Sequence, residues 1–265
     1  MSRRILITSA LPYVSGAKRL GNLFGSLLPA DVHARFHRQI GSEALFICAT
    51  DEHGTPTEIA AARSGQSARD FCDAQHLRQA ETYRGFGLSF DHFGRSSAPS
   101  NHSLTQHFYR CLDASGLIAE RIVPQIWSPS DGRFLPDRYI IGVCPHCGDP
   151  QARGDQCDAC GNLLDPTDLI RPRSALSGEH RLEVRESRHL YLRQSVLLDA
   201  LDGWLDTREG WPPFVTALAR SWLTTDLRDR CITRDLTWGV PVPRPGFEGK
   251  VFTSGSTRYT AWRRN

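Results

Sequence analysis

Four cysteines in the middle of the chain have the spacing of metal ligands. In the stretch CPHCGDPQARGDQCDACG they form two Cys-x-x-Cys pairs, Cys144 with Cys147 and Cys157 with Cys160. Each pair lies in a tight turn that directs two thiolates at one ion, and two such pairs complete a tetrahedral zinc site. Four thiolates leave no open coordination position, so we expect a structural zinc that replaces a hydrophobic core. The alternative is a redox-active pair, which normally occurs singly near the start of a helix.

The chain has eight cysteines and no recognisable export signal, which indicates thiols or metal ligands rather than disulfides. Four of them, Cys48, Cys72, Cys111 and Cys231, have apolar neighbours and are expected to be buried free thiols. The N-terminal MSRRILITSALPYV has an apolar run too short for a signal peptide and is better explained as a first β-strand. No apolar run approaches ~18 residues, so we expect a cytoplasmic protein that does not enter a membrane.

The composition fits a globular enzyme without a strong electrostatic bias. The 265 residues are 40% hydrophobic, enough for one large core or for one core with an inserted module. The net charge of +3 is spread along the chain, which permits a polyanionic partner but does not argue for one. Nearly all basic residues are arginine, which suggests a GC-rich genome.

The first part of the chain alternates strands and helices. An apolar strand over residues 3–10 precedes a helix over about 19–39, in which Pro29 should produce a kink or a break. A second apolar strand, 44–50, precedes a helix that ends near residue 64. This alternation predicts an α/β fold with a parallel sheet. Ligands of such sheets lie at the carboxyl ends of the strands, so the loops 10–18 and 50–55 are the expected site.

Several motifs together resemble the methionyl-tRNA synthetases, which are class I aminoacyl-tRNA synthetases. They occur in order over residues 4–252, and they are ILITSALPYVSGAKRLGN, ATDEHGTP, GRFLPDRYIIGVCPHCG, GDQCDACGNLLDP, PRSALSG and ITRDLTWGVPVP. The resemblance implies a Rossmann-type core split by a connective insertion that carries a zinc knuckle. It also implies attack of an amino-acid carboxylate on the α-phosphorus of ATP, with Mg²⁺, and transfer of the aminoacyl group to tRNA. In such chemistry the protein mainly positions reactants and stabilises charge at phosphorus.

The resemblance divides the chain into four parts. Residues 1–118 correspond to the first half of the catalytic core and residues 119–208 to the connective insertion. Residues 209–252 return to the core, and residues 253–265 form a tail that matches nothing in the family. The C-terminal part of the family's catalytic core and its anticodon-binding domain are not expected in this chain.

The resemblance implies an amino-acid site whose residues can be matched to this sequence one position at a time. Leu11, Pro12 and Tyr13 match the loop that lines the site. Asp51, followed by His53, matches the carboxylate that receives the substrate ammonium, a pairing that suits a charge-assisted hydrogen bond. The alternative for Asp51 is the N-cap of the helix that follows it.

The nucleotide site departs from the family pattern. The family's His-Ile-Gly-His element aligns with residues 19–22, where Gly21 keeps a close backbone approach and Asn22 is a tolerable substitute. Arg19 replaces the first histidine, and its longer, permanently charged fork binds phosphate differently. Loss of one such contact typically costs ~2.7–4 kcal/mol. Arg234 matches an arginine near the reacting groups, with a structural ion pair as the alternative.

The tail after Phe252 has a specific explanation. The family continues after KVF as something like Tyr-Val-Trp-Phe-Asp-Ala and later supplies a Lys-Met-Ser-Lys-Ser loop. When GC-biased codons for Tyr-Val-Trp-Phe-Asp-Ala lose their first base, they encode Thr-Ser-Gly-Ser-Thr-Arg, which is the sequence of residues 253–258. We therefore expect a frameshifted, truncated member, whose coding DNA read one frame over continues as synthetase-like sequence.

Two functional hypotheses follow. The first is ATP-dependent amino-acid activation, with transfer to tRNA or, in a repurposed relative, to a small N-hydroxylated amine. The second is a non-catalytic remnant or partner subunit that binds zinc, with or without a nucleotide, while a separate chain supplies the missing half. Loss of the last strands predicts an open sheet edge, exposed apolar surface and poor solubility.

Overall fold

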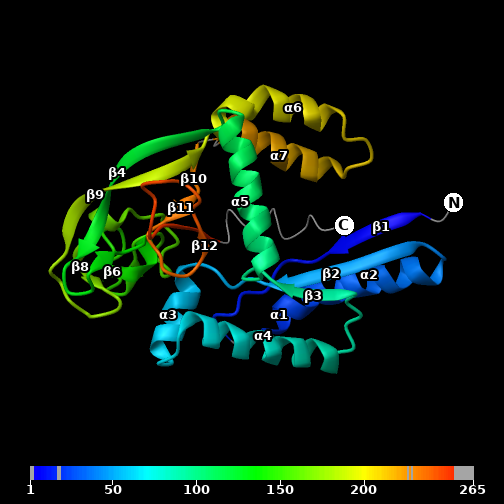
Figure 1. The fold of residues 1–265 in the computed structure, drawn as a ribbon, viewed down its shortest axis with the longest axis horizontal. Helices are drawn as coiled ribbons and strands as arrows, with labels where there is room; N and C mark the ends of the chain where they lie inside the picture. Colours follow the sequence, from blue (N-terminus) through cyan, green and yellow to red (C-terminus); the bar gives the residue numbers. More distant parts are fainter. Residues whose placement is uncertain (1–2, 17–18, 226, 228, 254–265) are drawn as a thin grey trace.

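A parallel three-stranded sheet forms the N-terminal layer of the computed structural model, which describes residues 3–16, 19–225, 227 and 229–253. The strand order is β1 (Arg4–Thr8), β2 (Glu43–Thr50) and β3 (His92–Arg95). Helix α2 (Leu28–Gln39) connects β1 with β2, and α3 (Thr55–Arg63) and α4 (Ala68–Gly85) connect β2 with β3 (Figure 1). This is the α/β arrangement that the alternating pattern predicts.

The helix after β1 is irregular where the sequence predicts a break at Pro29. A short α-helical turn, α1 (Leu20–Asn22), leads into the π-helical segment η1 (Leu23–Leu27), and α2 begins at Leu28. Pro29 has no N–H to donate to the preceding turn, so the regular α-helical ladder cannot run through this point. The helix therefore continues from α1 into α2, but with a wider π-helical turn between them.

The insertion contains two antiparallel sheets. The long strands β4 (Ile118–Ser128) and β9 (Glu183–Leu192) pair over ten residues from Ile118↔Leu192 to Trp127↔Glu183. The shorter strands of these sheets are β5 (Arg133–Phe134), β6 (Ile140–Val143), β7 (Ala152–Arg153) and β8 (Ile170–Ser174). β10 (Arg230–Cys231) comes from beyond the insertion and pairs with β9. The 3₁₀ turns of this region are η2 (Asp137–Tyr139), η3 (Pro166–Asp168) and η4 (Gln194–Leu197). Strands β6, β7 and β8 form a small sheet (Figure 1), and Cys144 directly follows β6.

Helix α5 (Pro99–Ala114) runs between the N-terminal sheet and the insertion (Figure 1). In the C-terminal part, α6 (Leu198–Asp206) and α7 (Pro213–Thr225) form a helical pair at one side (Figure 1). The return of residues 209–252 to the catalytic core stays a prediction. The last described strands are β11 (Thr233–Arg234), β12 (Val240–Pro241) and β13 (Val251–Phe252). Phe252 is buried against Tyr109 of α5. The expected frameshifted tail begins at Thr253, and its residues 254–265 lie outside the described part.

Glu58 of α3 joins three separate segments. Its Oε1 accepts hydrogen bonds from the backbone N–H groups of Thr237 and Trp238, both at 2.8 Å, and from the Thr237 hydroxyl at 2.9 Å. Its Oε2 accepts from Arg133 Nη2 at 2.9 Å and from the Tyr139 hydroxyl at 3.1 Å. The carboxylate is buried, so these donors replace the water that it loses.

The expected open edge is present among the described strands. β1 lies at one edge of its sheet, and Leu6 on it is 51% exposed. Phe24, Val32 and Phe36 of the following helices are each more than half exposed and line a shallow hollow of about 600 Å³. The poor solubility that we inferred from such a surface stays a prediction.

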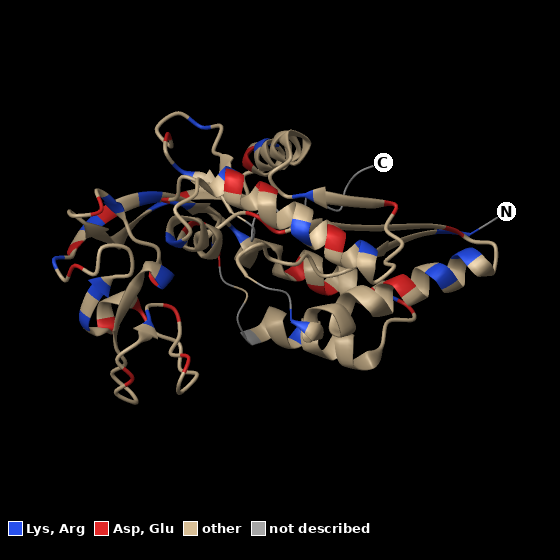
Figure 2. Cartoon of the chain, turned by 90° about the horizontal axis from the view of Figure 1, so that it is seen from below, with Lys and Arg blue, Asp and Glu red and all other residues tan. Residues whose placement is uncertain are grey.

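Surface charge and cysteine burial differ only in detail from the expectations. Basic and acidic residues are interspersed over the chain (Figure 2). Cys48 and Cys72 are buried, but Cys111 is exposed and Cys231 is half-buried, so the prediction of four buried thiols is wrong for these two. Cys111 lies on the outer face of α5, which apolar neighbours in sequence do not reveal.

Within the described residues, no helix is both long enough and apolar enough to span a bilayer.

Candidate functional site

The loops after β1 and β2 are hydrogen-bonded to each other. Tyr13 and Asp51 form an isolated parallel bridge. The Asp51 N–H donates to the Pro12 carbonyl at 2.9 Å, and the Val14 N–H donates to the Asp51 carbonyl at 3.2 Å. The order of two parallel strands thus brings Leu11–Tyr13 beside Asp51, as expected for loops at the same end of a sheet.

Asp51 and His53 are almost completely removed from solvent, each 1% exposed. Burial, followed by the nearby His102, lowers the pKa of His53 to about 3, so its ring is neutral at pH 7. The rings of His102 and Trp238 lie 5.3 and 5.7 Å from that of His53, measured between centroids. The neutral imidazole adds no positive charge next to Asp51.

A small hollow of about 210 Å³ adjoins the first loop. Four of its lining residues are expected site residues, namely Leu11, Pro12, Gly21 and Asn22. Apart from the neighbouring residues and the backbone of its own helix, no atom of the described residues lies within 4 Å of where a side chain at Gly21 would begin, so the space in front of it is open to a ligand. The hollow is smaller than the ~300–1,000 Å³ of ordinary ligand sites, so a nucleotide would extend beyond it.

Arg19 stands at the start of the helical segment that borders this hollow. Its backbone N–H donates to Asn22 Oδ1 at 3.2 Å, which orients the asparagine side chain back over the first turn. Arg19, Gly21 and Asn22 are all exposed. The three expected nucleotide residues are therefore adjacent and reachable from solvent.

Arg234 is not brought to these loops by any hydrogen bond or ion pair among the described residues. Its Nη1 donates to the carbonyls of Thr233 at 2.8 Å and Cys231 at 3.4 Å. Arg234 also lies close enough to Asp137 of the insertion to act on the pKa of that carboxyl group. Its neighbour Trp238 does reach the second loop, because Trp238 Nε1 donates to the Glu52 carbonyl at 2.7 Å.

The sequence reasoning did not single out Glu52 and His102. Glu52 is fully buried, and its Oε1 accepts from Thr50 Oγ1 at 2.7 Å and from Arg95 Nε at 2.8 Å. These bonds fix the loop that carries Asp51 and His53. The signal for Glu52 was three consecutive polar residues directly after a buried strand, whereas His102 on α5 has no sequence signal that links it to His53.

The four cysteines form one compact cluster. All four Sγ atoms lie within 4.8 Å of one another, with Cys144 and Cys160 3.9 Å apart and Cys147 and Cys157 3.6 Å apart. Four Zn–S bonds of ~2.3 Å in a tetrahedron place sulfur atoms about 3.8 Å apart, so the geometry fits zinc. Each knuckle turn ends on a glycine with positive φ, 78° at Gly148 and 75° at Gly161.

The family model described as tRNA synthetases class I (M) matches residues 5–253. The chain belongs to the methionyl-tRNA synthetase family of class I. It is 59% identical over 254 residues to a methionine–tRNA ligase of Caulobacter vibrioides and 57% identical over 249 residues to methionine–tRNA ligase 1 of Acaryochloris marina. Each alignment covers 94% of this chain and 45% of the relative, so the chain spans less than half of their length.

A solved structure shares the fold of this methionyl-tRNA synthetase family member. Mycobacterium tuberculosis methionyl-tRNA synthetase in complex with methionyl-adenylate is similar with a TM-score of 0.72 and 21% sequence identity. The match covers 99% of this chain and 46% of that one. The Rossmann-type class predicted from the motifs agrees with this likeness.

Proposed function

We propose that this chain carries the methionine- and ATP-binding part of a methionine–tRNA ligase and acts in the formation of methionyl adenylate. In that step a carboxylate oxygen of methionine bonds to the α-phosphorus of ATP. The bond from the α-phosphorus to the bridging oxygen breaks, and pyrophosphate leaves with its Mg²⁺. The identity of 59% to a methionine–tRNA ligase supports methionine as the amino acid and tRNA, rather than a small N-hydroxylated amine, as the acceptor.

The bridge between Tyr13 and Asp51 is the observation that carries this proposal. It brings a buried carboxylate beside a loop of apolar side chains, which suits a ligand with an ammonium group and an apolar side chain. Asp51 would receive the ammonium, and Leu11, Pro12, Tyr13 and His53 would surround the rest of the amino acid. Arg19, Gly21 and Asn22 would hold the nucleotide, Arg234 would act near the reacting groups, and the four cysteines would hold a structural zinc.

Asp51→Asn tests the proposal through methionine binding. The substitution keeps the size of the side chain but removes its charge, so a charge-assisted bond worth about 1.5–3 kcal/mol is lost. We expect the Kd for methionine, measured by equilibrium dialysis with the labelled amino acid, to rise about 10- to 100-fold. Asp199→Asn, on the exposed surface of α6, is the matched control and should leave the Kd unchanged. Equal binding by the Asp51 variant and the control would exclude the proposed ammonium site.

A second candidate function is binding of nucleotide and amino acid without turnover, and Arg19 favours it. A permanently charged guanidinium holds a phosphate in the ground state as well as in the transition state, which does not accelerate reaction. Exchange of labelled pyrophosphate into ATP, measured with methionine and a panel of other amino acids, separates the two candidates. Exchange above background with any amino acid excludes the second one.

Arg19→His restores the residue that the family pattern has at this position. If Arg19 weakens transition-state stabilisation, the exchange rate should rise by about 10²-fold, the usual effect of one well-placed donor at a reacting oxyanion. Arg19→Gln is the control, because it removes the charge without supplying an imidazole. An exchange rate that does not rise in the histidine variant means that Arg19 is not what limits the reaction.

A further inference from the structure

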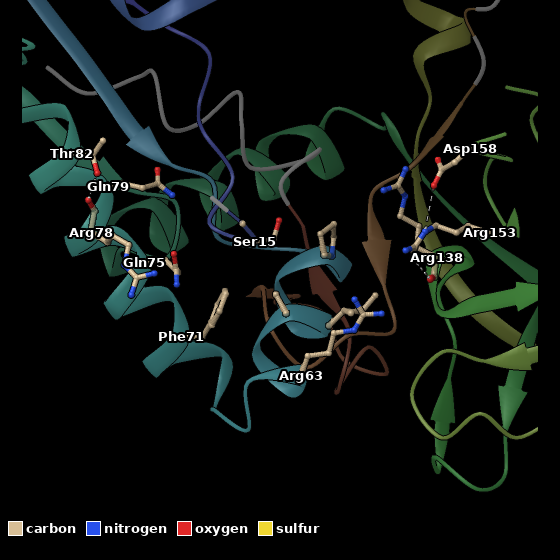
Figure 3. A pocket seen from close by; sticks show the side chains of 14 residues that line it. Ser15, Arg63, Phe71, Gln75, Arg78, Gln79, Thr82, Arg138, Arg153 and Asp158 are labelled. Atoms are coloured by element: carbon tan, nitrogen blue, oxygen red, sulfur yellow. Dashed lines mark hydrogen bonds and ion pairs between the residues drawn. The ribbon is translucent and has the colours of Figure 1, made fainter. Parts of the chain in front are cut away.

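A cavity of about 800 Å³ lies between the N-terminal helices and the insertion, away from the hollow at Leu11 and Gly21. Helices α3 and α4 form one wall, and residues of the insertion form the other (Figure 3). None of its lining residues lines the smaller hollow. Its volume lies within the ~300–1,000 Å³ of sites that hold small ligands.

Arginine dominates the charge of this cavity. Arg63 and Arg78 extend from the wall made by α3 and α4, and Arg138 and Arg153 lie on the opposite wall (Figure 3). Asp158 is the one acidic residue of the described lining. The cavity thus has an excess of three positive charges, although acidic and basic residues are mixed over the rest of the chain (Figure 2).

The arginines of the two walls differ in whether they already form ion pairs with acidic side chains. Arg138 Nε lies 2.6 Å from Asp155, and Arg153 Nε lies 3.9 Å from Asp158. Arg63 and Arg78, by contrast, make no ion pair and no side-chain hydrogen bond with any described residue. Two exposed guanidinium groups that line a cavity and have no acidic partner among the described residues are available to an anion.

Helix α4 adds a polar row to the same wall. Gln75, Arg78, Gln79 and Thr82 recur at intervals of three and four residues, so they lie along one face and span ~10 Å of the helix. Gln79 is 3% exposed, and its Nε2 donates to the Tyr13 carbonyl at 3.1 Å. Thr82 Oγ1 donates to the Arg78 carbonyl at 2.8 Å, so Gln75 and Arg78 are the members of the row that are left for a ligand. Together with Arg63 and the arginines of the other wall, they exceed what a single phosphate group contacts.

We propose that this cavity binds a ligand with two or more phosphate groups. Guanidinium groups pair with phosphate oxygens through two parallel hydrogen bonds, and the Gln75 amide supplies a further donor. Two sources share this chemistry, a free oligophosphate such as a nucleoside polyphosphate and the phosphodiester backbone of a single nucleic-acid strand. The site does not depend on adenylate formation, because its residues are separate from those assigned to methionine and ATP.

Titration with inorganic tripolyphosphate tests the site without involving a base or a sugar. Isothermal calorimetry on the full chain should give a binding site that persists in Arg19→Gln and is weakened by added salt, as expected for charge pairing. Arg63→Gln with Arg78→Gln should raise the Kd at least tenfold. The control is Arg84→Gln with Arg110→Gln, two exposed arginines on α4 and α5 outside the lining. Both double variants are first checked for an unchanged thermal midpoint, and if either has shifted, the single Arg63 and Arg78 variants replace the pair.

A second titration distinguishes the sources of phosphate. A fluorescent single-stranded RNA of six nucleotides is followed by anisotropy with the same variants. Binding of tripolyphosphate that depends on Arg63 and Arg78 supports a free oligophosphate, and binding of the RNA alone with that dependence supports a strand. The proposal is overturned if neither probe binds, if both double variants bind alike, or if Arg19→Gln removes the binding and places it at the other site.

Discussion

Cys157→Ser is expected to abolish zinc binding and to unfold the small sheet β6–β7–β8 while the parallel sheet persists. Structural zinc sites in small peptides contribute ~10–16 kcal/mol to folding at pH 7, more than a module with a small core can replace. The sulfur atoms of Cys144 and Cys157 are themselves part of the buried cluster with Leu135 and Leu169, so loss of the metal also exposes this core. Mass spectrometry measures the loss of zinc, and hydrogen exchange over residues 137–175 measures the unfolding of the small sheet.

Cys111→Ser is the matched control for this experiment. Cys111 is exposed on α5, outside the four-cysteine cluster, and its replacement should leave zinc content and exchange unchanged. A chelator added to the chain without substitutions should have the same effect as Cys157→Ser, and added zinc should reverse the effect of the chelator. Full zinc content in the Cys157 variant, or protection of the small sheet without metal, would disprove the structural role.

Glu58→Ala is expected to cost about 3–5 kcal/mol of unfolding free energy, the usual result when one partner of a buried charge pair is removed. The substitution leaves Arg133 half-buried without its carboxylate and leaves the Tyr139 hydroxyl and the backbone N–H groups of Thr237 and Trp238 without acceptors. Each group must then find water or remain unsatisfied. Unfolding by denaturant, monitored by circular dichroism, gives the free energy of unfolding of the variant and of the unchanged chain.

Glu58→Gln separates charge from shape in the same network. Its carbonyl oxygen still accepts from Thr237 and Trp238, but its amide group presents donors to Arg133 and the Tyr139 hydroxyl, so we expect an intermediate loss. Glu81→Gln, at an exposed position of α4, should stay within about 0.5 kcal/mol of the original chain. A loss below 1 kcal/mol for Glu58→Ala would contradict the role of this carboxylate as a junction.

Local spacing made the metal cluster and the loop positions predictable. Two Cys-x-x-Cys turns determine where four sulfur atoms lie almost independently of the rest of the chain, and the sulfur distances agree. The approach of Tyr13 to Asp51 follows from strand and helix alternation, since parallel neighbours end at the same edge. The break before α2 follows from one proline.

Contacts between distant segments were not predictable from the sequence. Nothing near Glu58 in the chain indicates that its donors come from the insertion and from the segment after α7. Arg234 has a motif around it, yet its guanidinium donates to nearby carbonyls rather than to either loop. The arginine-lined cavity combines residues of α3, α4 and the insertion that share no motif.

The bonds of Glu58 also set an order of events during synthesis of the chain on the ribosome. Its Oε1 atom meets backbone donors that are 179 and 180 residues further along, so α3 emerges long before Thr237 and Trp238 exist. Contacts this distant in sequence form late, because a long loop must close first. The Oε1 atom of Glu58 therefore stays hydrated until nearly all of the described chain has left the exit tunnel, whereas its Oε2 atom can bind Arg133 and Tyr139 earlier.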